Sequence, residues 1–177
     1  MDIEIRPLMD ADLAVLRELD HSYHTDYVWQ MSLDVGEQET SVNFKEVRLP
    51  RSMRVEYPWP EDWVHQTWQK RNSVLIAVVD DQTVGYLSLV KDDTARLVRI
   101  TNLVVLRRLR RRQIGSTLLQ AAEVWMAQQG AGLLQLEMQV KNHPAICMAK
   151  ALGYEFNGYR DEYFPNRDIA LFFARRI

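Results

Sequence analysis

A chain of 177 residues with 47% hydrophobic and 26% charged residues has the size and composition of one globular domain with its own core. Its single cysteine, Cys147, excludes an internal disulfide framework, and no apolar run approaches the roughly 20 residues of a membrane-spanning helix. The acidic, alternating start MDIEIRPLMDAD is neither a signal peptide nor a transit peptide, so we expect a soluble, cytoplasmic protein.

The net charge of −2 hides an asymmetry between the two halves of the chain. Residues 1–94 carry nine Lys/Arg against 18 Asp/Glu, whereas residues 95–177 carry 13 against six. This division suggests one cationic and one anionic partner, although solvated surface charge produces the same kind of pattern.

The first elements follow from hydrophobic periodicity. Residues 3–8 alternate and end at a proline, which predicts a strand. Residues 10–23 repeat apolar residues at helical spacing, and Asp10 is placed to cap that helix.

The middle of the chain is harder to interpret. Within residues 25–60, only residues 40–49 alternate like a strand, and residues 50–60 predict a proline-bounded loop. The segment EDWVHQTWQKR then predicts a helix with Trp63 and Trp68 turned inward.

The pattern sharpens after residue 72. Residues 73–79 and 84–90 predict a hairpin around a DDQT turn, and the first of these strands is apolar on both faces and so central. The remaining predicted elements are a strand at 95–106, a helix at 114–130 ending at Gly130, a strand at 133–140, a helix at 142–153, and strands at 154–159 and 168–176. These elements predict a mixed α/β domain with a right-handed strand–helix–strand unit.

Residues 107–119, RRLRRRQIGSTLL, place five arginines within six residues, between a predicted strand and a predicted helix. Exposed N–H groups and the positive end of the helix dipole meet there, and Gly115 lets the backbone approach an anion closely. A nucleic-acid arm more usually spreads its basic residues along a tail or a helix face, whereas the helix here carries only Glu123 as a charge. We therefore favour a phosphate or pyrophosphate site over a solvated loop or a nucleic-acid site.

Two segments carry a family resemblance. VVLRRLRRRQIGSTLLQAAE, and NHPAICMAKALGY beginning 27 residues after Gly115, resemble the two motifs of the GNAT N-acetyltransferase superfamily. The general layout of the superfamily covers nearly the whole chain. Within it, the long N-terminal half and the YxxxYF…DIALFF ending look most similar to streptothricin-acetyltransferase-like members.

The resemblance implies a single domain, residues 1–177, with a mixed, mostly antiparallel central sheet flanked by helices and acetyl-CoA between two splayed central strands. Residues 1–94 would form mainly the acceptor side and residues 95–177 mainly the acetyl-CoA side. One strand end would bind the thioester carbonyl, loop N–H groups would hold the pantetheine and pyrophosphate, and an asparagine would reach the pantetheine from the other side. The implied cofactor-binding residues are Leu103, Val104, Val105, Arg110, Arg111, Arg112, Gln113, Ile114, Gly115, Ser116 and Asn142.

Two positions depart from the family pattern. Gln113 stands where the first glycine of the loop motif is usual, and a left-handed backbone there would cost about 1 kcal/mol. Ala149 stands seven residues after Asn142, where many relatives carry the tyrosine that protonates the departing thiolate. Either another group supplies that proton or the thiolate leaves unaided, which a thiol pKa of about 8.5 allows.

Glu137 is the first catalytic candidate, as a base or as an anchor for an ammonium group. Alternation in LLQLEMQV puts it on the polar face of a central strand, where a carboxylate is costly unless it meets solvent or a cation. Tyr159 and Tyr163 could supply the missing acid or line the acceptor pocket, although packing is the commoner fate of a loop tyrosine.

Acidic and aromatic residues together suit a cationic amine, so the substrate-binding candidates are Asp26, Trp29 and Asn102. We expect no metal site, because His21 and His24 lack a third ligand at suitable spacing. Trp59 is expected to pack, and Cys147 is expected to be a small buried hydrophobic residue.

Together, these features predict an acetyl-CoA-dependent N-acetyltransferase that acts by direct attack of a primary amine of a small cationic molecule, antibiotic-like or polyamine-like. Two alternatives stay open: a protein N-terminal or lysine acetyltransferase, and an acyl-CoA-binding module with little turnover. No nucleic-acid or membrane partner is expected, and a homodimer stays open.

Overall fold

Seven strands form one sheet and two long strands form a separate hairpin in the computed structural model, which describes residues 1–59 and 73–176. The sheet order is β1-β4-β5-β6-β7-β9-β8. The strands are β1 (Glu4–Pro7), β2 (Tyr23–Val35), β3 (Thr40–Val55), β4 (Ser73–Val79), β5 (Gln82–Asp92), β6 (Leu97–Val105), β7 (Leu133–Gln139), β8 (Glu155–Arg160) and β9 (Ala170–Arg176); the helices are α1 (Asp12–Glu18), η2 (Arg107–Leu109), α3 (Ile114–Gln128) and α4 (His143–Ala151). Only β6 and β7 pair in parallel among these strands, which confirms the predicted mixed, mostly antiparallel sheet.

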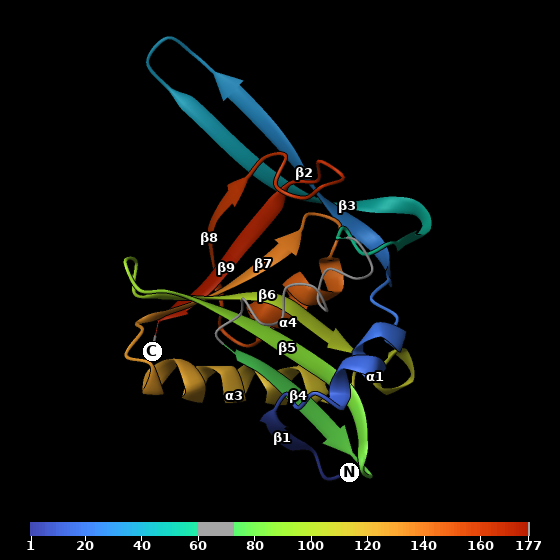
Figure 1. Ribbon diagram of the computed structural model, residues 1–177. Coiled ribbons are helices and arrows are strands. Elements are labelled where there is room, and N and C mark those ends of the chain that lie inside the picture. Colours follow the sequence, from blue (N-terminus) through green and yellow to red (C-terminus); the bar gives the residue numbers. More distant parts are fainter. Residues whose placement is uncertain (60–72, 177) are drawn as a thin grey trace.

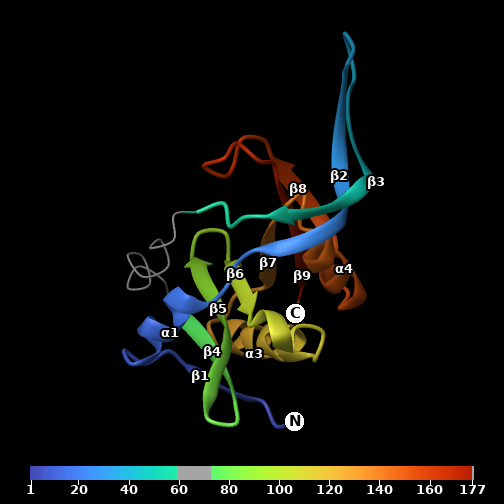
Figure 2. The ribbon, with the colours of Figure 1, turned by 90° about the vertical axis from the view of Figure 1, so that its right-hand side faces the viewer.

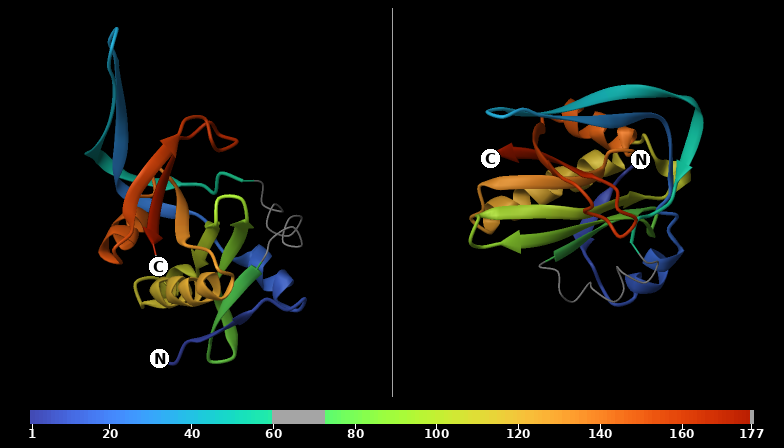
Figure 3. Two further views of the ribbon diagram at one scale, coloured as in Figure 1. Left: turned by 90° about the vertical axis from the view of Figure 1, so that its left-hand side faces the viewer. Right: turned by 90° about the horizontal axis from the view of Figure 1, so that it is seen from above.

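Helices cover both faces of the sheet. α3 and α4 lie on one face and α1 on the other (Figure 1, Figure 3). Alternate residues of the strands, such as Leu87 and Leu136, join the α3 core, whereas Tyr86 and Val104 join the smaller core under α1. β4 is buried on both faces, as predicted for a central strand, although the turn after it consists of two left-handed residues, Asp80 and Asp81, and not of the whole DDQT segment.

Helix α3 follows the prediction closely. Its buried residues all come from the predicted apolar face: Ile114, Leu118, Leu119, Ala122 and Met126. Trp125, also on that face, packs against the core but is only partly buried. Gly130 follows the helix in a left-handed conformation, with φ of 67°, which is how glycine commonly ends a helix.

β6 and β7 separate toward their carboxyl ends. They pair only from Leu97 with Leu133 to Ile100 with Leu136. A bulge in the pairing of β6 with β5 follows directly, between Ile100 and Asn102. Beyond it, β7 pairs only with β9 among the described residues. The splayed pair of central strands that the resemblance implies is therefore present.

The hairpin of β2 and β3, here called the arm, extends well beyond the sheet (Figure 1, Figure 2). The predicted strand at residues 40–49 is part of β3, but the predicted loop is wrong over residues 50–55, because β3 continues to Val55, and it is confirmed only at residues 56–59. Pro50 falls where the register between the two strands shifts, and a proline is tolerated at such an irregularity.

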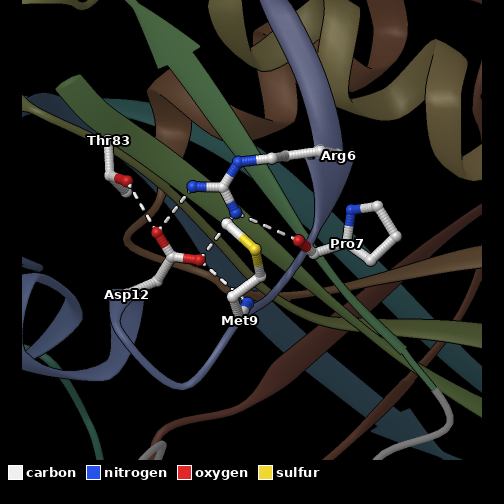
Figure 4. Close-up of polar contacts among 5 residues, drawn as sticks. All are labelled: Arg6, Pro7, Met9, Asp12 and Thr83. Atoms are coloured by element: carbon white, nitrogen blue, oxygen red, sulfur yellow. Dashed lines mark hydrogen bonds and ion pairs between the residues drawn. The ribbon is translucent and has the colours of Figure 1, made fainter. Parts of the chain in front are cut away.

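Helix α1 begins beside a cluster of polar contacts around Asp12 (Figure 4). None of the described side chains caps this helix, so the predicted capping role of Asp10 is wrong. The Asp12 carboxylate instead accepts two hydrogen bonds from Arg6, at 2.7 and 2.8 Å, one from the Met9 N–H at 2.9 Å and one from the Thr83 hydroxyl at 3.0 Å. The Arg6 guanidinium holds the pKa of Asp12 at about 2, against the opposing effect of burial. This cluster joins β1, α1 and β5.

The predicted helix containing Trp63 and Trp68 lies outside the described residues. Trp59 packs edge-on against Phe164, with ring centroids 5.9 Å apart, in agreement with its predicted packing role. None of the helices that the structure describes combines the length and hydrophobicity that a membrane crossing requires.

Candidate active site

The loop between β6 and α3 turns around two left-handed residues. Arg111 has φ of 63° and Gln113 has φ of 67°, so Gln113 adopts the strained conformation considered from the sequence. Within the described part of the chain, no side chain caps the start of α3. The first N–H groups of the helix, from Ile114, Gly115 and Ser116, are therefore available to an anion.

Arg110 holds this loop in place. Its guanidinium donates hydrogen bonds to the backbone oxygens of Val105 at 2.9 Å, Ser22 at 2.8 Å and Asp20 at 2.8 Å. Burial lowers the pKa of Arg110, but a guanidinium stays charged at neutral pH. The side chain of Arg110 is thus engaged in shaping the loop, whereas the other four arginines of the loop, Arg107, Arg108, Arg111 and Arg112, are exposed.

A hollow of about 330 Å³ lies beside the loop, next to the turn between β4 and β5. Arg108 and Arg112 line it, together with Asp80 and Leu109. Two guanidinium groups therefore border this hollow, on the side of the loop that faces the turn between β4 and β5.

Gly115 lies where the start of α3 approaches α4. A Cβ atom at Gly115 would be 3.3 Å from Met148 Sδ and 4.0 Å from Leu103 Cδ2. On the α4 side, Asn142 caps the helix, because its Oδ1 accepts a hydrogen bond from the Ala145 N–H at 3.2 Å. The Asn-x-x-Ala motif thus fixes the start of α4.

Glu137 lies on the other face of the sheet, at the point where β6 and β7 separate. Its neighbours Leu136 and Met138 belong to the α3 core, so Glu137 faces away from that core. One of its oxygens is 2.9 Å from Arg99 Nη1, and the other accepts a hydrogen bond from the Tyr163 hydroxyl at 2.7 Å. The carboxylate is 5% exposed, and burial together with its charge raises the pKa of Tyr163, which keeps that phenol protonated.

A second group of polar side chains, around His21, lies on the α1 face of the sheet. His21 Nε2 is 2.9 Å from the hydroxyl of the fully buried Tyr86, and its ring packs on that of Tyr57 at a centroid distance of 4.6 Å. Asn102, which directly follows the bulge in β6, donates a hydrogen bond to the Tyr57 hydroxyl. Burial lowers the pKa of His21, so its imidazole is neutral at pH 7.

Three other candidates lie elsewhere. Asp26 is exposed on β2, where the register of the arm shifts. Trp29 packs against the α3 core, with Lys150 Nζ 5.1 Å from its ring centroid. Tyr159 packs edge-on against Phe44 of the arm, at a centroid distance of 5.2 Å. Of the five catalytic and substrate-binding candidates besides Glu137, the structure therefore brings Tyr163 to Glu137 and Asn102 to the His21 group.

Cys147 is exposed, so the predicted buried role is wrong. α4 buries Ile146 and Ala149 instead, and Cys147 lies one turn beyond His143, with its Sγ 3.4 Å from His143 Nε2. Because Ala149 is fully buried and carries no hydroxyl, α4 offers no proton donor at that position.

The sequence does not single out Arg99 or Tyr57 as members of the site. Arg99 alternates with the buried residues Val98 and Ile100, so strand periodicity alone would place it on the polar face beside Glu137. No comparable signal exists for Tyr57, which reaches Asn102 across 45 positions of the chain.

The chain is similar to known acetyltransferases. The model of the Acetyltransferase (GNAT) family matches residues 42–154, more than half of the chain. A Bacillus subtilis (strain 168) protein provisionally named as a [ribosomal protein bS18]-alanine N-acetyltransferase is 30% identical over 113 residues, which are 62% of this chain and 72% of that protein.

Solved structures give the same fold. A nourseothricin acetyltransferase matches with a TM-score of 0.85 and 20% identity over 99% of both chains. A provisionally named streptothricin acetyltransferase from Bacillus anthracis str. Ames, in complex with acetyl coenzyme A, matches with a TM-score of 0.80 and 20% identity over 100% of this chain and 99% of the other.

Proposed function

We propose that the chain, which belongs to the Acetyltransferase (GNAT) family and takes its acetyl group from acetyl-CoA, delivers that group to a primary amine of a small cationic molecule. The observation that carries the proposal is the buried carboxylate of Glu137 at the strand separation, on the face of the sheet opposite α3. A buried carboxylate with aromatic neighbours suits an amine that arrives as an ammonium ion.

The two halves of the chain divide the work in this proposal. Residues 95–177 form mainly the acetyl-CoA side, with the loop at Arg110–Ser116, the strand end at Leu103–Val105 and Asn142 as its binding groups. Residues 1–94 form mainly the acceptor side, to which they bring His21 and Tyr57. The uncapped start of α3 supports this division, because its free N–H groups match the needs of a pyrophosphate.

The chemistry requires two proton transfers around the acyl transfer itself. Bound acetyl-CoA supplies the thioester carbonyl that the amine attacks, and the bond to sulfur then breaks. An alkyl amine with a pKa near 10 is almost wholly protonated at pH 7, so it must lose a proton before it attacks.

We assign that first proton to His21. Its ring is neutral at pH 7 and is held by the Tyr86 hydroxyl, so it can accept a proton. Both oxygens of Glu137 already accept hydrogen bonds, from Arg99 and Tyr163, so we do not propose it as the base; its role in this proposal is to receive the ammonium group beside these two partners. Ala149 has no proton to give, and the raised pKa of Tyr163 makes its phenol a weak acid, so we propose that the thiolate leaves unaided and takes its proton from solvent, while Tyr163 orients Glu137.

A specific observation favours one other acceptor. The Bacillus subtilis relative is named for acetylation of a protein alanine, and it is 30% identical over 62% of this chain, against 20% over 99–100% for the two antibiotic-acetylating structures. The second candidate function is therefore acetylation of a protein N-terminus.

A thiol-release assay with three acceptors separates the candidates: nourseothricin, spermidine, and a peptide with an N-terminal alanine. We expect the first or second acceptor to be used with a kcat/KM at least about 100-fold above that of the peptide, the discrimination of about 3 kcal/mol that a cationic site can supply. Turnover of the peptide alone would instead establish the second candidate. Calorimetry with acetyl-CoA provides the control, because the donor must bind whichever acceptor is used.

A further inference from the structure

The outer half of the arm carries an apolar row that the described residues of the chain leave uncovered. The register pairs Met31 with Phe44 and Leu33 with Val42, which puts these side chains on one face of the hairpin. Leu33 is 54% exposed and Val35, next on the same face, is 71% exposed. The opposite face of this segment is polar: Gln30, Ser32, Asp34, Ser41, Asn43 and Lys45.

The inner end of this row is already packed. Phe44 contacts Phe156 and Tyr159 of β8, with ring centroids 5.8 and 5.2 Å away, and β8 is the last strand of the sheet. The row therefore begins against the sheet and runs outward past its edge. A two-stranded hairpin on its own is marginally stable in water, so strands of 13 and 16 residues need another surface to cover their outer half.

The charge along the arm indicates which surface that is. The tip carries three carboxylates and no cation at residues 34–39: Asp34, Glu37 and Glu39. The inner part of β3 carries four cations against one carboxylate at residues 45–54: Lys45, Arg48, Arg51 and Arg54 against Glu46. Two such arms lying antiparallel would place each acidic tip beside the basic part of the other, whereas a parallel arrangement would place like charges together.

We infer that the chain forms a two-fold symmetric dimer in which the apolar rows of two arms pack against each other in antiparallel orientation. The row is the same on both copies, as a two-fold interface requires, and the complementary charges at its two ends set the direction. This inference uses the arm alone and does not depend on the acceptor proposed above.

The inner part of the arm links this interface to the candidate active site. The Trp29 N–H donates to the backbone oxygen of Val140, just beyond β7, at 2.9 Å. Glu46 is 3.0 Å from His143 Nε2, and Tyr27 stacks on the same imidazole at 4.8 Å. Dimerisation would therefore fix strands that contact the start of α4, beside the Asn142 cap.

Sedimentation velocity on the full chain tests the inference. The wild type should sediment as a dimer at micromolar concentration. L33E/V35E should raise the dimer dissociation constant at least about 100-fold, because it buries four carboxylates in an apolar interface. V124E is the matched control, since Val124 is 60% exposed on α3 and lies outside the arm. The exposure of Leu33 and Val35 in the monomer means that the variants should keep a folded circular dichroism spectrum, whereas the melting temperature of L33E/V35E should fall because the stabilisation from association is lost.

Charge reversal tests the direction of the arms. E37K/E39K should weaken the dimer about 10-fold or more, and adding R48E/R51E should restore it because the complementary pairs are rebuilt with exchanged signs. A monomeric wild type, or a dimer that L33E/V35E leaves intact, would overturn the inference. The apolar row would then bind another protein or no protein. If the variant with all four substitutions did not recover the dimer affinity, the antiparallel arrangement would be overturned.

Discussion

Arg99 and Glu137 form an ion pair between β6 and β7, with Nη1 and Oε1 2.9 Å apart, at the point where the paired part of the two strands ends. The pair faces away from α3, and the Tyr163 hydroxyl completes it on the other oxygen. The ion pair therefore links β6 and β7 at the place where their pairing ends. It also fixes the position of the Glu137 carboxylate at the proposed acceptor site.

Replacement of Glu137 by glutamine should lower kcat/KM for the amine about 100-fold, because an amide holds an ammonium group less well than a carboxylate does. The KM for acetyl-CoA should change less than about 3-fold, since Glu137 faces away from α3, whose start is the proposed cofactor site. Steady-state kinetics with each substrate varied in turn measures both effects. E155Q, at an exposed position of β8, is the control. An unchanged kcat/KM would remove Glu137 from the acceptor site.

His21 should control the acid side of the pH–rate profile. Burial lowers the pKa of His21 below the ordinary value of about 6.5. Of its charged neighbours, Arg110 also lowers this pKa, whereas Asp20 raises it. The base is therefore lost only when the pH falls below that ordinary value, and kcat/KM should decline there. H21N should lower kcat/KM about 100-fold or more and abolish this limb of the profile.

The matched control for H21N is H24N, because His24 is exposed and lies 3.4 Å from Arg107. H24N should keep both the wild-type kcat/KM and the decline of kcat/KM at low pH. If H21N also kept the limb, the proton would pass to another group, and Glu137 would become the first candidate.

Gly115→Asp should weaken CoA binding by at least about 2 kcal/mol, because it adds an anion and bulk beside the proposed phosphate position. The same change brings a Cβ atom to 3.3 Å from Met148 Sδ, but this side chain is flexible and an aspartate in the first turn of α3 is favourable to the helix dipole, so the loss of stability should be smaller than the loss of binding. Titration calorimetry and thermal melting measure the two effects separately. G132D is the control, because a Cβ atom there meets nothing within 4 Å. Wild-type CoA affinity in folded G115D would contradict the phosphate assignment.

Asp12→Asn should lower the free energy of unfolding by about 1 to 2 kcal/mol at pH 7, as the Arg6 contacts are weakened. The folded-state pKa of Asp12 is about 2, below the unfolded value of about 3.9, so its contribution is complete above pH 4 to 5 and is lost as the pH falls toward 2. Urea unfolding at several pH values should therefore show the wild type and D12N converging in acid. D10N should match the wild type throughout, because Asp10 does not cap α1.

The sequence predicts the β6–α3–β7 unit well because its signals are local. Apolar residues at helical spacing, a stop at Gly130 and alternation in β7 each act within a few residues of the element they define. The arm escapes prediction because its strands pair mainly with each other and carry polar residues at the exposed positions, with Pro50 in the middle of β3. Local propensity at such a proline favours a loop, and only the register shift in the folded hairpin accommodates it.

The candidate site divides in the same way. Alternation is enough to put Glu137 on a polar face. The partners of Glu137 are 38 and 26 positions away in the chain, at Arg99 and Tyr163, and only the packing of β6 and β9 beside β7 brings them together. Similarly, helical spacing shows that α4 has a buried face, but not that Cys147 falls outside it.

Arg110 connects the two proposed substrate sites through its hydrogen bonds. The same guanidinium that shapes the cofactor loop holds the backbone oxygens of Asp20 and Ser22, the residues on either side of His21. If acetyl-CoA orders this loop when it binds, it should also order the backbone around His21, the proposed base. The two substrates should therefore bind with positive cooperativity. Thermodynamic linkage makes this effect mutual. The amine should therefore raise the affinity for acetyl-CoA by the same factor by which acetyl-CoA raises the affinity for the amine. Such an enzyme would favour a ternary complex over either binary one.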